Sequence, residues 1–270
     1  MASAITVLFL GDIVGEEGMQ CTRSFLPSLI QKYNADFVIV NGENSHEGHG
    51  INEEIITELI ELGVHVITGG DHSFDKWKVF SYMRQHHHIL RPLNYPSGNA
   101  GYGFGIYDIP NTPLKFGVIN LQGRTFMKAI DDPFKAVDWA LDHIQKETKL
   151  IFIDFHAEAT AEKVSMAWHV DGRASVLVGT HTHIPTGDAR IFPKGLGYIT
   201  DAGMTGSYAG SLGMDKKVAL KRFITGVHQK YKAATGDARL SGIVAKINTD
   251  TGSCEHIEHF AFPAFNNSSS

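Results

Sequence analysis

Cysteine is scarce in this chain of 270 residues, which contains only Cys21 and Cys254. Two cysteines cannot build a disulfide framework, and their spacing does not match a metal-binding motif, so we expect reduced thiols in a reducing compartment. A surplus of positive charge is also missing, because 24 Lys and Arg face 29 Asp and Glu and give a formal net charge of -5. Nucleic-acid binding as the main function of this protein is therefore disfavoured.

Long apolar runs are absent as well. The run at residues 5–10 ends at once in Gly11 and Asp12. It is too short for a signal peptide, and too short for the roughly 20 apolar residues that a membrane-spanning helix needs. The sequence therefore predicts a cytoplasmic protein without a membrane partner. A P-loop and a Gly-x-Ser-x-Gly nucleophile elbow are also missing, and residues 101–105 do not match the dinucleotide-binding fingerprint.

The first third of the chain contains an alternation of strand and helix patterns. Hydrophobic residues make up 43% and charged residues 20% of the chain, which is typical of a globular protein with a sizeable core. We expect strands at 5–10, 36–40 and 64–68, and helices at 20–33, after a cap at Asn52, and at 76–84. This alternation predicts a parallel sheet with helices on its faces and with the carboxyl ends of the strands at one edge.

The rest of the chain carries further strand and helix patterns, without an internal repeat or a linker. Residues 92–105 are rich in Gly, Pro and Asn and predict a long loop. We expect strands at 103–107, 115–120, 150–155, 175–178, 197–200, 242–247 and 256–262, and helices at 131–147, 158–168 and 216–227. The sequence therefore predicts an α/β protein with one domain over residues 1–265 and a flexible tail at 266–270.

Ligand-type residues follow each of the first three expected strands. Asp12, Glu43 with Asn44, and Asp71 with His72 lie about 30 residues apart, which is one strand–helix step. Folding then brings them to the edge at which open α/β sheets bind their ligands.

Histidines follow two of the later strands. His156 closes one strand, and His181 and His183 follow another. In an extended segment these last two side chains point the same way, because the side-chain period is two. Each residue alone has an ordinary explanation as a turn, cap or core residue, but five such strand ends together predict a metal centre. Mixed carboxylate, amide and imidazole ligands suit Mn, Fe or Zn better than Ca. The run His86 to His88 has no partner at ligand spacing, and we expect it to lie on a solvated face.

The sequence around these strand ends resembles the blocks of the calcineurin-like metallophosphoesterases. These blocks are Gly11-Asp12, Gly42-Glu43-Asn44, Gly70-Asp71-His72 and the GTHTH segment at 179–183. The sequence resembles one bacterial branch, the YmdB-like phosphodiesterases, more closely still. The segments that carry this resemblance are NLQGR at 120–124, DFHAEA at 154–159, DGRAS at 171–175 and GMTG at 203–206. The resemblance covers the chain from Ile5 to about Phe262.

The resemblance implies a four-layer α/β/β/α sandwich, in which two mixed sheets pack face to face between layers of helices. It implies two divalent metal ions, with Fe or Mn expected first and Zn as an alternative. One ion is assigned to Asp12, Asn44 and His183, the other to Asp71, His156 and His181, and Glu43 is assigned as the bridge between them. His72 is implied as the proton donor to the leaving oxygen, and not as a ligand.

The activity implied by the resemblance is a metal-dependent phosphodiesterase for cyclic nucleotides of the 2′,3′-cyclic AMP type. Two dications about 3.5–4 Å apart lower the pKa of a bridging water, which attacks the phosphorus, and they clamp the phosphoryl oxygens. The expelled alkoxide needs a proton, and a histidine is suited to supply it. The expected partner is a small phosphodiester, RNA-derived products included. A homo-oligomer is left open.

Asp71 departs from the family pattern, which has Asn at this position. Asp12, Glu43 and Asp71 carry a formal charge of -3, where the family pattern carries -2. The additional charge should bind the second ion more tightly and make it a weaker Lewis acid. We therefore expect a more alkaline pH optimum or a changed metal preference.

Three other functions remain open at this point. A phosphomonoesterase or 5′-nucleotidase uses the same two-metal core. A regulatory protein that senses a metal or a nucleotide would not need His72. An amidohydrolase-type enzyme also uses His-x-His, but normally after its first strand.

Overall fold

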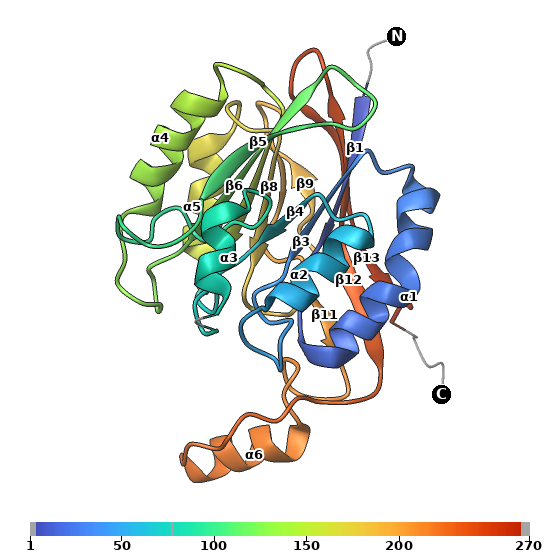
Figure 1. Cartoon of the computed structure of the whole chain (residues 1–270), viewed down its shortest axis with the longest axis vertical. Coiled ribbons are helices and arrows are strands. Elements are labelled where there is room, and N and C mark those ends of the chain that lie inside the picture. The colour runs from blue at the N-terminus through green and yellow to red at the C-terminus, as the bar shows by residue number, and fades with distance from the viewer. Residues whose placement is uncertain (1–3, 77, 266–270) are drawn as a thin grey trace.

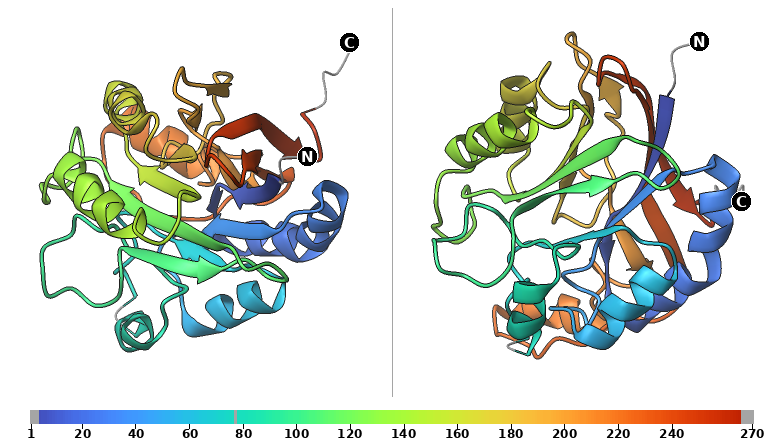
Figure 2. Two further views of the ribbon diagram at one scale, coloured as in Figure 1. Left: turned by 90° about the horizontal axis from the view of Figure 1, so that it is seen from above. Right: turned by 45° about the horizontal axis from the view of Figure 1, so that its top comes forward.

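A computed structural model describes residues 4–76 and 78–265 of the chain (Figure 1). The tail predicted at 266–270 lies outside the described residues. Two mixed β-sheets pack face to face, and helices cover their outer faces (Figures 1 and 2). This architecture confirms the four-layer α/β sandwich that the resemblance implies.

The first sheet contains the three strands expected in the first third of the chain. Its order is β2 (Asp12–Ile13), β11 (Met204–Ser207), β12 (Ala238–Asn248), β1 (Ala4–Leu10), β3 (Phe37–Asn41) and β4 (Val66–Thr68), and β13 (Cys254–Phe262) also pairs with β12. β1, β3 and β4 are parallel neighbours, as predicted. β12 runs antiparallel to β1, so the sheet is mixed.

The second sheet is built from the middle of the chain. Its order is β5 (Phe104–Asp108), β6 (Lys115–Gln122), β7 (Ile151–His156), β8 (Val176–Thr180), β10 (Gly197–Ile199) and β9 (Arg190–Ile191). The four strands from β6 to β10 are parallel. The five ligand-bearing strand ends therefore come from two sheets, and not from the edge of a single one.

Three clusters of buried side chains hold the layers together. One fills the space between the sheets, where the rings of Phe9 and Phe152 lie 5.2 Å apart. A second lies between the first sheet and the helices α1 (Gly15–Tyr33), α2 (Glu53–Glu61) and α3 (Val79–Gln85). The third lies between the second sheet and the helices α4 (Pro133–Ile144) and α5 (Thr160–Val170). Burial on both faces explains why the central strands read as continuous apolar runs.

Helix boundaries follow the capping residues where these are present. Asn52 caps α2 by accepting from the Ile55 N–H at 2.9 Å, and Asp132 caps α4. The expected start of α1 at residue 20 is wrong, because the helix begins at Gly15. Gly18 lowers the helix propensity of this first turn, so the sequence pattern does not show the start of the helix. Glycine is needed there because a Cβ would lie 2.4 Å from the Thr205 carbonyl oxygen.

Helix α6 (Lys216–Thr225) lies on an arm, residues 208–237, that connects β11 to β12 and extends from the lower end of the molecule in Figure 1. The base of this α6 arm is closed by two backbone hydrogen bonds, from Asp215 to Lys232 at 2.8 Å and from Ala234 to Gly213 at 2.8 Å. Only Ala219 is buried among the residues of α6. The arm is thus an appendage of the sandwich and not one of its layers.

Candidate metal centre

The seven predicted ligands come together where the carboxyl ends of the two sheets meet. Asp12 follows β1, Glu43 and Asn44 follow β3, and Asp71 follows β4 in the first sheet. His156 ends β7, and His181 and His183 follow β8 in the second sheet. Face-to-face packing of the sheets therefore brings together residues that are up to 171 positions apart, from Asp12 to His183.

Four of these side chains form a tight cluster of ligand atoms. Glu43, Asp71, His156 and His181 each offer one such atom, and these atoms all lie within 4.8 Å of one another. His156 Nε2 lies 3.0 Å from Glu43 Oε1, 3.1 Å from Asp71 Oδ1 and 3.1 Å from His181 Nδ1. Glu43 and His156 are buried, whereas Asp71 and His181 reach partly to solvent.

The other three predicted ligands lie directly beside this cluster. The Asn44 amide donates to Glu43 Oε1 at 3.2 Å and lies 3.3 Å from His183 Nε2. Asp12 Oδ1 lies 3.7 Å from the His156 ring, and Asp12 Oδ2 accepts from the backbone N–H of His181 at 3.1 Å. Glu43 Oε1 therefore contacts both His156 in the cluster and Asn44 beside it. A ligand that bridges two ions would need this position.

A polar contact on the far side of each imidazole turns its other ring nitrogen toward the cluster. His156 Nδ1 lies 2.9 Å from Thr180 Oγ1, which in turn donates to Asp154 at 2.7 Å. His181 Nε2 lies 3.0 Å from Glu158 Oε2, at ion-pair distance. The other ring nitrogens, His156 Nε2 and His181 Nδ1, face one another at 3.1 Å. A divalent cation beside them would be bound by both atoms.

Two further observations fit a metal ion at this place. Asp12 Oδ1 is buried and has no hydrogen-bond partner among the described residues, and an unpaired buried carboxylate oxygen is costly. Gly70 leaves the space open, because a Cβ there would lie 2.2 Å from the His156 ring and 2.4 Å from Glu43 Oε2. The residues present therefore fit a divalent cation.

The electrostatics of the cluster also favour a cation. Burial alone would lower the pKa of His156, but Glu43 and Asp71 outweigh it and raise this pKa well above its usual value. Burial would raise the pKa of Asp71, but contact with His156 and His181 holds it far below its usual range. Burial raises the pKa of Asp12, against the opposing effect of His183 and His156. Negative charge is thus concentrated around the His156 ring, where it favours a positive charge.

The prediction that His181 and His183 point the same way from an extended segment is wrong. β8 ends at Thr180, and His181 and His183 have positive φ angles of 96° and 64°. Such angles are unfavourable for residues other than glycine, and they cluster at functional sites. The two rings separate as a result: His181 faces His156, and His183 faces Asn44 while its Nδ1 donates to the Leu212 carbonyl at 3.1 Å.

His72 lies at the rim of the cluster, with 39% of its side chain exposed to the adjoining pocket. Its backbone N–H donates to Glu43 Oε2 at 2.9 Å, and its Nδ1 lies 2.8 Å from Asp75 Oδ2. Its Nε2 is thereby turned toward Asp71 Oδ2, 3.9 Å away. Burial would lower the pKa of His72, but Glu43, Asp71 and Asp75 raise it.

A pocket of about 730 Å³ opens directly over the candidate ligands. Its floor includes Glu43, Asn44, His181 and His183, and His72 lies at its side. Its outer wall comes mainly from the α6 arm, through Leu212, Met214, Arg222, His228, Gln229 and Tyr231. The size is in the range of small-molecule sites, which hold ligands in cavities of about 300–1,000 Å³.

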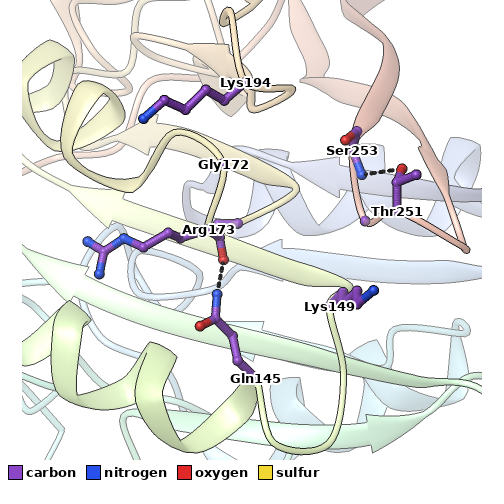
Figure 3. A pocket seen from close by; sticks show the side chains of 9 residues that line it. Gln145, Lys149, Gly172, Arg173, Lys194, Thr251 and Ser253 are labelled. Atoms are coloured by element: carbon purple, nitrogen blue, oxygen red, sulfur yellow. Dashed lines mark hydrogen bonds between the residues drawn. The ribbon is translucent and has the colours of Figure 1, made fainter.

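A second hollow, of about 370 Å³, lies at the opposite, amino-terminal ends of β7, β8 and β10. Lys149, Arg173 and Lys194 line it, and Figure 3 shows the amino group of Lys149 pointing to the opposite side from the charged ends of Arg173 and Lys194. Arg173 is paired with Asp138 at 2.7 Å. This hollow contains none of the predicted ligands, and its cations do not converge on one ligand.

The histidines at 86–88 lie outside the candidate metal centre, and all three are partly or fully exposed, as expected of a solvated face. They also pack against aromatic rings. His86 stacks on Tyr82 with ring centroids 3.6 Å apart, and His87 stacks on Tyr102 at 3.9 Å. His88 has a buried Nε2 without a partner among the described residues.

Several supporting residues of the site have no role assigned to them from the sequence. Thr180, Glu158 and Asp154 orient the two imidazoles, and burial raises the pKa of Asp154 to about 6. Asn120 fixes the chain before Gly70 by accepting from the Gly69 N–H at 3.0 Å. Asp154 carried a readable signal, because it precedes His156 by two residues and so lies on the same face of β7.

Among the described residues, helices that are both long and apolar enough to cross a bilayer are absent.

Comparisons with known proteins agree with the fold and with the family that the sequence resembles. The chain is 45% identical over 252 residues to a Bacillus subtilis protein named 2′,3′-cyclic-nucleotide 2′-phosphodiesterase, and the match covers 93% of this chain and 95% of that protein. The structure of a hypothetical protein from Thermus thermophilus has a TM-score of 0.87 at 37% identity, covering 95% of this chain and 98% of that one. The structure of a phosphatase from Mycoplasma pneumoniae has a TM-score of 0.90 at 31% identity, covering 97% of this chain and 94% of that one.

A 5′-nucleotidase from Candida albicans shares the fold alone, with a TM-score of 0.57 at 11% identity; the match covers 95% of this chain and 50% of that one. A sequence model of a family described as YmdB-like protein matches residues 8–260. This match includes every candidate ligand, and the chain therefore belongs to the YmdB-like family, as its strand-end blocks predict.

Proposed function

We propose that this protein is a phosphodiesterase that hydrolyses 2′,3′-cyclic nucleotides with two divalent metal ions. The observation that carries the proposal is the convergence of ligand atoms from Glu43, Asp71, His156 and His181 within 4.8 Å, on the floor of an open pocket. The name of the Bacillus subtilis relative supports the substrate class. Asp12 Oδ1, which is buried and has no hydrogen-bond partner among the described residues, supports a metal ion in preference to a structural hydrogen-bond network.

We assign the ligands to two half-sites. Asp71, His156 and His181 would hold one ion, and Asp12, Asn44 and His183 the other, with Glu43 shared between them. All seven residues come from one chain, so the site is complete without a partner subunit. Carboxylate, amide and imidazole donors suit Fe, Mn or Zn. When bound, two such ions polarise a phosphoryl oxygen and acidify a water at neutral pH.

We assign His72 as the group that protonates the leaving oxygen. Asp75 fixes its Nδ1 at 2.8 Å, which leaves Nε2 facing the site. The Glu43 contact with the His72 backbone, at 2.9 Å, couples the position of this acid to the shared ligand. A general acid placed in this way contributes about 10²–10⁴-fold to a rate.

The substrate would lie between the ligands and the α6 arm. The pocket volume of about 730 Å³ suits a mononucleotide. Arg222 on the outer wall has no ion-pair partner in the part of the chain that the structure describes, so its charge is available to an anionic or aromatic ligand.

Assays on the metal-free protein, reloaded in turn with Mn²⁺, Fe²⁺ and Zn²⁺, test this proposal. We expect turnover of 2′,3′-cyclic AMP and of bis-p-nitrophenyl phosphate, and little turnover of nucleoside monophosphates. Faster hydrolysis of monophosphates would support a phosphomonoesterase on the same core. Metal binding without any turnover would support a sensor and contradict the proposal.

A further inference from the structure

A buried ion pair lies beneath the segment that carries His181 and His183. Lys163 on α5 and Asp201 after β10 are both fully buried, and Lys163 Nζ lies 2.8 Å from Asp201 Oδ2. Neither residue is among the candidate ligands. Buried charged pairs give little net stability compared with apolar residues, so their presence calls for another reason.

Asp201 holds the residue between the two histidines. The same oxygen that pairs with Lys163 also accepts from the backbone N–H of Thr182 at 3.0 Å and from its hydroxyl at 2.7 Å. The other oxygen accepts from the Gly203 N–H at 2.8 Å. Within the described part of the chain, this carboxylate therefore bonds to the buried lysine, to Thr182 and to the chain next to β11.

Thr182 needs such an anchor because the residues on both sides of it have unfavourable backbone angles. His181 and His183 have φ angles of 96° and 64°, which persist only when surrounding contacts determine them. These same angles direct His181 toward His156 and His183 toward Asn44. Fixing Thr182 thus fixes both histidines at once.

Lys163 supplies the charge that makes this anchor possible. A carboxylate without a counter-charge at this depth would be strongly disfavoured, the more so beside Asp12. The lysine has room because position 179 is glycine: a Cβ there would lie 2.9 Å from Lys163 Cδ and 1.8 Å from the Thr200 carbonyl oxygen. The glycine of the GTHTH segment therefore leaves room for the Thr200 backbone and for Lys163.

We propose that Lys163 and Asp201 are positioning residues that set the affinity of both metal half-sites through Thr182. This inference rests on the proposed metal centre, but not on the identity of the substrate. It differs from the effect of a single ligand, because loss of His181 or of His183 should weaken mainly one of the two ions.

The test is calorimetric titration of the metal-free protein with Mn²⁺, comparing Asp201→Asn with the parent chain. We expect the affinities of both ions to fall by about 10- to 100-fold, as is usual when a supporting partner of a ligand is removed. Asp171→Asn is the matched control, because Asp171 is a buried carboxylate that accepts backbone hydrogen bonds from Lys194 and Leu196 at the opposite edge of the sheet. Its affinities should stay at the parent values.

Thr182→Val should leave the fold intact, because it only replaces one hydroxyl by a methyl group on a partly exposed residue. We expect a smaller loss of affinity for both ions in this variant, and recovery in Thr182→Ser. Parent affinities in Thr182→Val would overturn the inference, as would equal losses in Asp201→Asn and Asp171→Asn. If the parent binds two Mn²⁺ ions but cleaves no phosphodiester, the proposed function fails and the inference is still decided by the affinities. A parent chain that binds none of Mn²⁺, Fe²⁺ and Zn²⁺ would overturn both.

Discussion

The floor and the outer wall of the same pocket are built in opposite ways. The floor consists of strand ends held between two sheets, and Glu43 and Asn44 on it are almost fully buried. The wall consists of the α6 arm, on which Phe223 and Ile224 are 81% and 79% exposed. Residues 216–232 of this arm contain six Lys or Arg and no Asp or Glu, in a chain whose net charge is -5. From this difference we infer that the sandwich holds the groups for the proposed chemistry and that the arm contributes to substrate binding.

The greatest loss should come from the shared ligand on the floor. In Glu43→Gln the metal content and the turnover should both fall, by more than the approximately 100-fold that loss of a supporting partner costs. The measurement is metal analysis together with steady-state turnover of 2′,3′-cyclic AMP. Glu61→Gln, at an exposed position in the last turn of α2, is the control and should behave like the parent. Retained metal and activity in Glu43→Gln would remove the bridge assignment.

The next greatest loss should come from the acid at the side of the pocket. In His72→Ala we expect kcat to fall by about 10²–10⁴-fold with an unchanged metal content, because the leaving oxygen loses its proton donor. His228→Ala removes a histidine from the arm side of the same pocket and should leave kcat within a few-fold of the parent. Equal losses of kcat in both variants would contradict a special role for His72.

The arm itself should act on binding and not on chemistry. In Arg222→Ala we expect KM to rise by about 10-fold, the size of one lost hydrogen bond to a charged group, while kcat changes little. Lys221→Ala changes the neighbouring residue, which does not line the pocket, and should leave both constants unchanged. A fall in kcat at constant KM in Arg222→Ala would place this arginine in the chemistry and break the division between floor and arm.

A weaker effect concerns the charge of the floor. Asp71→Asn removes one of three carboxylates, so the second ion becomes a stronger Lewis acid and acidifies water more strongly. The acid limb of the pH–rate profile should therefore move to lower pH, with the maximum rate within a few-fold of the parent. Superimposable profiles of Asp71→Asn and the parent would show that the departure from the family pattern is without consequence.

The sequence predicts the floor well because the floor is made of strand ends. Buried strands give strong local patterns, and Asp12, Glu43, Asp71 and His156 follow or end them. Two sheets placed face to face then bring these ends together whatever the details of the loops. The assignment of individual half-sites and the expectation of two sheets came from resemblance, since strand alternation alone favours a single sheet.

The supporting contacts could not be predicted in the same way. The carboxylate of Asp201 meets Lys163 only after two crossovers of the second sheet, and neither residue has a local pattern that reveals the other. The backbone angles of His181 and His183 depend on these contacts and on Asp12, so that local alternation gave the wrong conformation. The two-residue strand β2 and the four-residue strand β11 are too short for a periodic signal.

The proposed mechanism requires that one chain holds two ions with Glu43 between them. An anomalous difference map from crystals of the Mn²⁺-loaded protein tests this requirement. We expect two peaks about 3.5–4 Å apart, one beside Asp71, His156 and His181 and the other beside Asp12, Asn44 and His183, with Glu43 contacting both. A single peak, or two peaks that do not share Glu43, would contradict it.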